Sequence, residues 1–135
     1  MPARGTKRGS PNRKPTPASR GHTPDPSPED LVGVEDELRR LVTRADPHLR
    51  MERHWAIDWY VGTDLIVCIG RFSRHVGVEF WRGRSLVEAG HPLEGTGKNL
   101  RHLKIRTLEQ VRTPVVLRAV HAAVRLDHAS PKRVR

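Results

Sequence analysis

The sequence predicts an α+β fold, in which an antiparallel sheet of about four strands is flanked by amino- and carboxy-terminal helices. Three observations support this fold class: apolar residues recur at helical spacing after Pro28, they do so again after Pro114, and they alternate with period two in between. Two amphipathic helices beside an antiparallel sheet make a sandwich of two layers.

The first helix is predicted to begin at Pro28 and to end before Pro47. Ser27 can cap it, a proline suits its first turn, and the acids Glu29 and Asp30 lie where the helix dipole favours negative charge. Pro47 disfavours helical geometry in the residue before it. The apolar stripe of this helix is formed by Leu31, Val34, Leu38, Leu41, Val42 and Ala45.

The strands are predicted between His54 and Trp81, because apolar residues there occupy every second position. Gly62-Thr63-Asp64 and Ser73-Arg74 supply turn residues between them, which favours an antiparallel meander. A fourth strand with one charged face is expected from Arg101 to Ile105. The alternating sets are Trp55, Ile57 and Trp59; Leu65, Val67 and Ile69; and Val76, Val78 and Phe80.

The last helix is predicted to begin at Pro114, with Thr113 as its cap, and to run to Asp127. Before it, Thr107 and Gln110 have the spacing of a capping box for a short helical turn. The stripe of the last helix is formed by Val116, Leu117, Val120, Ala123 and Val124.

The net charge of +10 belongs to the ends of the chain. Residues 1–27 are rich in Pro, Gly and Ser and have almost nothing apolar to bury, so we expect a disordered basic arm there, a single domain over residues 28–128 and a basic tail over 129–135. Such an arm can bind nucleic acid weakly and non-specifically through counterion release, or serve only as a solubilising tail. Its cations are Arg4, Lys7, Arg8, Arg13, Lys14 and Arg20.

The cellular location follows from the single cysteine and from the hydropathy. One cysteine, Cys68, excludes an internal disulfide and fits a reducing compartment. No apolar run approaches the roughly 18 residues that span a bilayer, and the amino terminus lacks the apolar core of a secretory signal. We therefore expect a cytoplasmic protein. Cys68 lies in an apolar strand with no base near it in sequence, which indicates an inert thiol and no enzymatic activity.

Two stretches resemble the YdhG-like domain family, also called domain of unknown function 1801. They are RHVGVEFWRG at residues 74–83 and LEGTGKNLRHLKI at residues 93–105, and the likeness extends over about residues 31–127. Residues 51–59 lack the Trp-Gly-x-Pro segment of that family. The resemblance implies a small α+β fold, usually bacterial and cytosolic, without an agreed enzymatic activity. Some members are described as frataxin-like iron chaperones, which implies iron as ligand and an iron-accepting protein as partner.

Iron needs converging carboxylates or imidazoles, and the sequence offers two candidate sets. The acids of the first helix, namely Glu29, Asp30, Glu35, Asp36 and Glu37, form either a diffuse acidic surface of the frataxin kind or a solvated helix face. His75, His91 and His102 converge only if the strands that carry them are neighbours.

The glycine loop is the candidate anion site, and its residues are Gly95, Thr96, Gly97, Lys98, Arg101 and His102. The spacing is not that of a nucleotide-hydrolysing loop, because Pro92 stands where that motif needs a glycine and Asn99 where it needs Ser or Thr. Exposed backbone N–H groups with the cations can bind a phosphate or carboxylate. Alternatively, Gly95 and Gly97 supply special backbone angles while Lys98 and Arg101 pair with Glu79 or Glu94.

Overall fold

The structure is a computed structural model that describes residues 25–129. The predicted arm, with its six cations, and most of the predicted basic tail lie outside these residues. The elements are α1 (Pro28–Ala45), β2 (Arg50–His54), β3 (Ile57–Val61), β4 (Leu65–Arg71), β5 (Val76–Phe80), α2 (Gly83–Glu88), β6 (Arg101–Ile105), α3 (Leu108–Val111) and α4 (Pro114–Ala129). The predicted α+β class is confirmed.

The sheet has five antiparallel strands in the order β2-β3-β4-β5-β6, so the predicted number of about four was one short. The missed strand is β2, an edge strand whose five residues, Arg50–His54, are mostly polar and show no apolar alternation. Trp55, which we assigned to a strand, instead lies in the turn between β2 and β3. An edge strand with solvated side chains carries little of the hydrophobic pattern that identifies strands.

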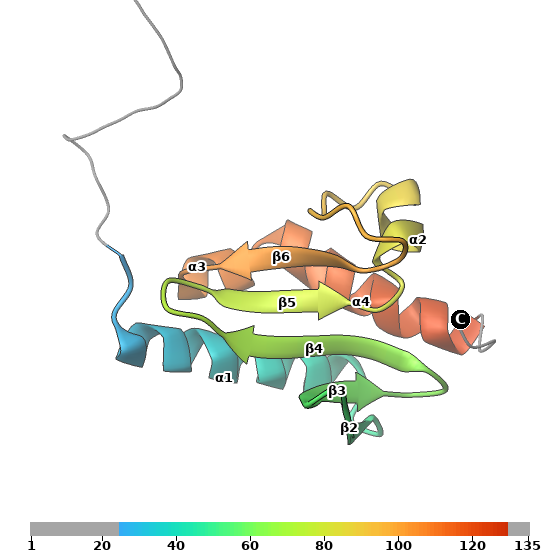
Figure 1. Cartoon of the computed structure of the whole chain (residues 1–135), viewed down its shortest axis with the longest axis horizontal. Helices are drawn as coiled ribbons and strands as arrows, with labels where there is room; N and C mark the ends of the chain where they lie inside the picture. The colour runs from blue at the N-terminus through green and yellow to red at the C-terminus, as the bar shows by residue number, and fades with distance from the viewer. Residues whose placement is uncertain (1–24, 130–135) are drawn as a thin grey trace, which may run out of the picture.

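The two long helices lie side by side against one face of the sheet (Figure 1). Their apolar stripes and the inward residues of the central strands form the main core. Its centre is fully buried, as Leu38, Val76, Val78, Phe80 and Ala119 each have 0% exposure. The helical spacing in α1 and α4 and the period-two spacing in β5 therefore identified the core correctly.

The predicted starts of α1, α3 and α4 are confirmed, whereas α4 ends at Ala129, two residues beyond the predicted end at Asp127. Ser27 and Asp30 form a capping box at α1, and Thr107 and Gln110 form one at α3. Helix α1 ends at Ala45, two residues before Pro47. Pro114 begins α4 as predicted, while the Thr113 hydroxyl donates to the carbonyl of Gln110. The short helix α2 was not predicted, because its six residues are too few to show a helical stripe.

A buried carboxylate ties the end of α4 to the sheet. Asp127 is 2% exposed, and its two oxygens accept hydrogen bonds from the backbone N–H groups of Thr63 and Asp64, at 2.8 and 2.9 Å. Asp64 in turn accepts from the backbone N–H of Leu65 and from the indole N–H of Trp81. The turn between β3 and β4 is thereby fixed from the helical layer.

Candidate nucleic-acid interface

One face of the sheet lies opposite the helical layer, and we call it the open face. In an antiparallel sheet, directly paired residues lie on the same face. One such row crosses the whole sheet, since Trp59 pairs with Glu52 and with Cys68, and Glu79 pairs with Cys68 and with His102. The open face consists of Arg50, Glu52, His54, Ile57, Trp59, Val61, Cys68, Gly70, Gly77, Glu79, His102 and Lys104.

Three tryptophans form a stack at one part of this face. Trp59 is buried, and Trp81 meets it edge to face with ring centroids 5.6 Å apart. Trp55 stacks on Trp81 at 5.8 Å with an interplanar angle of 22°. Trp55 is 69% exposed, so its ring presents a flat surface to solvent. We call Trp55, Trp59 and Trp81 the tryptophan stack.

The backbone holds Trp55 in an unusual conformation. Trp55 and Ala56 both have positive φ, at 54° and 61°. Positive φ at both central residues is typical of a type I′ hairpin turn. Asn and Gly are the usual residues there, because a side chain such as tryptophan is strained at positive φ. The ring contact with Trp81 offsets part of that strain and fixes the position of Trp55 over the sheet.

The second feature of the open face is a cavity of about 440 Å³, which we call the glycine hollow. Its floor includes Gly70 and Gly77, which pair directly across β4 and β5. A Cβ atom placed on Gly70 would meet nothing within 4 Å, so the space above this residue is open. Ile57 and Phe72 contribute apolar walls, and Phe72 is 60% exposed.

Polar groups line the rest of the glycine hollow. His75 stacks on Phe72 with centroids 4.9 Å apart and an interplanar angle of 20°. Burial lowers the pKa of His75, and the positive charges of Lys104, Arg106 and His102 lower it further. The His75 ring is therefore mainly neutral at pH 7, and the potential around it is positive. The hollow is also lined by Cys68, Glu79, His102 and Lys104.

Cys68 behaves as the sequence predicted for a thiol in an apolar strand. It is 7% exposed, and burial together with the negative charge of Glu79 raises its pKa to about 12. The thiolate, which is the nucleophilic form, is therefore scarce at neutral pH.

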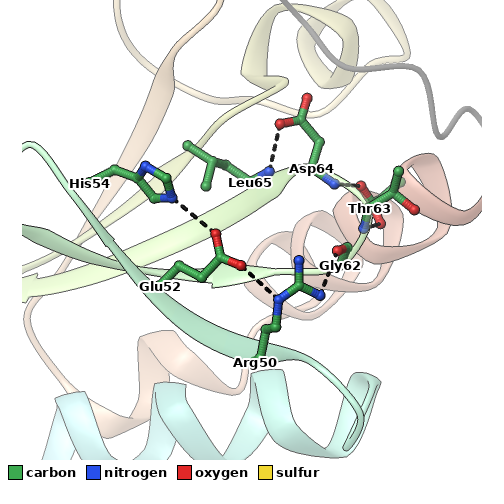
Figure 2. Close-up of polar contacts among 8 residues, drawn as sticks. Arg50, Glu52, His54, Gly62, Thr63, Asp64 and Leu65 are labelled. Atoms are coloured by element: carbon green, nitrogen blue, oxygen red, sulfur yellow. Dashed lines mark hydrogen bonds and ion pairs between the residues drawn. The ribbon is translucent and has the colours of Figure 1, made fainter.

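A chain of polar contacts runs along the edge strand of the open face. Figure 2 shows Arg50 donating to the carboxylate of Glu52 at 2.7 Å and to the carbonyl of Gly62 at 3.2 Å. The other carboxylate oxygen of Glu52 contacts Nε2 of His54 at 3.1 Å. These contacts fix β2 to the turn after β3, beside the tryptophan stack.

The structure does not bring all residues of the predicted anion site in the glycine loop together. Gly95 has φ of +125°, as the special-angle interpretation expects, whereas among the described glycines only Gly90 and Gly95 have positive φ, so Gly97 does not. Arg101 donates to the carbonyls of Gly97 and Leu100 at 2.6 and 2.7 Å, where we had expected Glu79 or Glu94 as its partner.

The other members of the predicted anion site lie apart from the Arg101 contact. Thr96 and Lys98 are exposed on the loop, while His102 lies on the open face with its ring 3.7 Å from the carboxylate of Glu94. Anion binding by the loop stays a prediction.

The acids of α1 are divided among different partners. Asp30 belongs to the capping box, Glu35 forms ion pairs with Arg39 and Arg71, and Glu37 forms them with Arg40 and Arg44. Glu29 and Asp30 also line a cavity of about 770 Å³ beside α3, and Asp36 is exposed.

The three predicted histidines are only partly brought together. His75 and His102 both line the glycine hollow, whereas His91 does not. Between residues 25 and 129, no group of three or more His, Cys, Asp or Glu side chains is placed to hold a metal ion. Iron binding stays a prediction.

Sequence reasoning missed the aromatic character of the open face. It treated Trp55 as a strand residue and gave no role to Phe72 or Trp81. The only available signal was the position of Phe72, an aromatic residue directly before the Ser73-Arg74 turn, where burial is not expected. The stacking of Trp55 on Trp81 depends on the hairpin turn and leaves no pattern in the sequence.

Comparisons with known proteins do not establish a family for this chain. A scan of family models gave no match, and a search of curated proteins gave none either. A search of solved structures found a protein of the DUF1801 family, YdhG from Bacillus subtilis, to which the chain is similar. The identity is 16%, the TM-score is 0.44, and the match covers 79% of this chain and 95% of that one. The fold described above rests on the structure itself.

Proposed function

We propose that this chain is a non-enzymatic protein that binds single-stranded nucleic acid on the open face. The observation that carries the proposal is the pair of exposed aromatic rings, Trp55 and Phe72, at a hollowed sheet face that α1 and α4 do not cover. Aromatic side chains on a sheet offer stacking surfaces for unpaired bases, and each stacked base contributes about 1–3 kcal/mol. A duplex keeps its bases stacked on one another, so it gains little from such a surface.

The charge distribution supports an anionic partner. Residues 1–24 carry six cations and no acidic residue. The chain enters the described region at Asp25, which forms an ion pair with Arg74 in the turn that also contains Phe72 and His75. The basic arm is thus attached at the end of the sheet where the glycine hollow lies. At about 3.3 Å per extended residue, an arm of this length has ample reach across the open face.

Binding rather than catalysis is supported by the chemistry of the hollow. The one cysteine, Cys68, has a raised pKa. The neutral ring of His75 is stacked on Phe72, and among the described residues it forms no hydrogen bond with a hydroxyl or thiol group. A nucleophile with its activating base is the usual sign of covalent catalysis. Stacking and charge neutralisation need neither.

The proposal is tested by fluorescence anisotropy with a labelled single-stranded oligonucleotide and its duplex, using the full chain at several salt concentrations. We expect the single strand to bind more tightly, and Phe72→Ala and Trp55→Ala each to weaken binding about tenfold, as loss of one stacked base predicts. Replacing the six arm cations with Gln should reduce the slope of log affinity against log salt by up to about 4.

The matched control is Val32→Ala, which shortens an exposed apolar side chain on α1, in the helical layer. This variant should bind like the wild type. Equal affinity of wild type, Phe72→Ala and Trp55→Ala would refute the open face as the binding surface, even if the arm variant lost affinity.

The iron-chaperone role implied by the resemblance is a second, separate prediction. The ion pairs of Glu35 and Glu37 with arginines leave the acidic surface of α1 partly neutralised, which is why we favour nucleic acid. Anaerobic titration with ferrous iron, followed by amide shifts, tests the role. Saturable shifts confined to residues 29–37 would support it, and the absence of any response would refute it.

A further inference from the structure

The glycine hollow has the shape of a site for one nucleobase, and this inference rests on the proposed function. Its floor lacks a side chain at Gly70, so a flat ring can approach the strand backbone closely there. The space above Gly70 is empty, whereas a Cβ on Gly77 would meet the Phe72 ring at 3.0 Å. Phe72 therefore leans over Gly77 and forms one wall of a slot. The cavity of about 440 Å³ has room for one base.

Groups at the hollow provide both stacking and charge. Phe72 and His75 stack on each other with centroids 4.9 Å apart and an interplanar angle of 20°, so a base can stack on the outer face of this pair. Lys104 is exposed and lies in the row of Gly70 and Gly77, where its ammonium group can meet the phosphate of a nucleotide. Burial lowers the pKa of His75 most, and the nearby positive charges of Lys104 and Arg106 lower it further; these two cations suit an anionic ligand.

The carboxylate of Glu79 can discriminate between bases that bind in the hollow. It pairs with Cys68 and His102 in the sheet, it is half-buried, and it lines the cavity. Its carboxylate accepts a weak contact from the Cys68 thiol at 4.0 Å. A carboxylate only accepts hydrogen bonds, so it suits a base edge that carries an amino group and disfavours one that carries a carbonyl.

We propose that the glycine hollow is a base subsite that selects cytosine over uracil, with Glu79 as the specificity-determining residue. Cytosine and uracil have nearly the same shape, but cytosine has an exocyclic amino group where uracil has a carbonyl oxygen. The amino group donates to the Glu79 carboxylate, whereas the uracil oxygen faces a second acceptor. One well-placed contact of this kind discriminates about tenfold between bases.

The test is a titration of the full chain with cytidine monophosphate and with uridine monophosphate, followed by two-dimensional amide spectra. We expect saturable shifts at Gly70, Gly77 and Lys104, with cytidine monophosphate binding about tenfold more tightly. Inorganic phosphate, which lacks a base, should leave the two glycine amides unmoved. Equal affinities for the two nucleotides, or the same shifts with inorganic phosphate, would overturn the subsite.

Glu79→Gln separates the role of the carboxylate from that of the hollow. An amide both donates and accepts, so this variant should bind both nucleotides within about twofold of each other. Glu94→Gln is the matched control, because Glu94 also contacts His102 but does not line the hollow. It should keep the preference for cytosine. An unchanged preference in Glu79→Gln would overturn the role of Glu79.

Gly70→Val places a side chain in the hollow, where a Cβ on residue 70 meets nothing within 4 Å, and a β-branched residue suits a strand. It should abolish nucleotide binding while oligonucleotides still bind through Trp55 and the arm. If oligonucleotides bind in a Trp55-dependent manner but nucleotides are not selected, the subsite is wrong and the proposed function stands. If neither binds, both proposals fail.

Discussion

The two faces of the sheet are built from the same strands but from different kinds of residue. On β5, Val76, Val78 and Phe80 point to the helices and are completely buried, while Gly77, Glu79 and then Trp81 point to the open face and are only partly covered. Because successive side chains of a strand point to opposite faces, β5 contributes buried apolar residues to the core on one face and partly exposed residues to the open face.

The open face is poorly suited to stabilise a sheet. Paired glycines at positions 70 and 77 weaken strand packing because they have no side chain to contact their neighbours. Glu79 on the inner strand β5 and His102 on the edge strand β6 place polar groups on the face, where valine or isoleucine would pack better. We therefore expect substitutions on the helix-covered face to lower stability, and substitutions on the open face to weaken binding with little loss of stability.

The largest expected difference is between two phenylalanines. Phe80→Ala removes a side chain with 0% exposure from the helix-covered core, and we expect it to lower the free energy of unfolding by about 3–5 kcal/mol. Phe72→Ala, the matched change at 60% exposure, should lower it by less than about 1 kcal/mol. Urea denaturation measures both values. Similar losses for the two variants would show that the faces do not differ in this way.

A smaller effect is expected at Asp127, which links the two faces. Asp127→Ala leaves the backbone N–H groups of Thr63 and of buried Asp64 without their acceptor, and we expect the free energy of unfolding to fall by about 2–4 kcal/mol. Asp127→Asn keeps one carbonyl oxygen and should lose less. The measurement is again urea denaturation, with amide spectra to follow Trp81, whose indole is held by Asp64 in the same turn. Equal losses for Ala and Asn would contradict the hydrogen-bond account.

Most of the fold could be predicted from local patterns. The stripes of α1 and α4, the alternation in β3 to β6 and both capping boxes are present in the sequence, because each depends on residues within a few positions of one another. The strand β2 could not be predicted in this way. Its pairing with β3 is set by the turn at Trp55 and Ala56, whose positive φ angles are unusual for those residue types.

The candidate site was predicted much less well than the fold. The residues 93–102 were identified as a notable loop, but Arg101 closes that loop on itself while His102 lies on the open face. Phe72 and Trp55 received no functional role. The long helices α1 and α4 cover one face, and a second apolar cluster buries Trp59 on the open face, so the exposed aromatic side chains are those in the turns, Trp55 and Phe72.

The sequence by itself determined the α+β class, the two long helices, the burial of the alternating apolar residues of β4 and β5 and the location of the net charge at the ends of the chain. These properties depend on local spacing and on composition. Only the tertiary structure decided that Gly70 lies beside Gly77, that Trp55 stacks on Trp81 and that Glu79 lies between Cys68 and His102. Strand register and turn geometry bring these residues together across the sheet, and that proximity is not encoded in any single stretch of the chain.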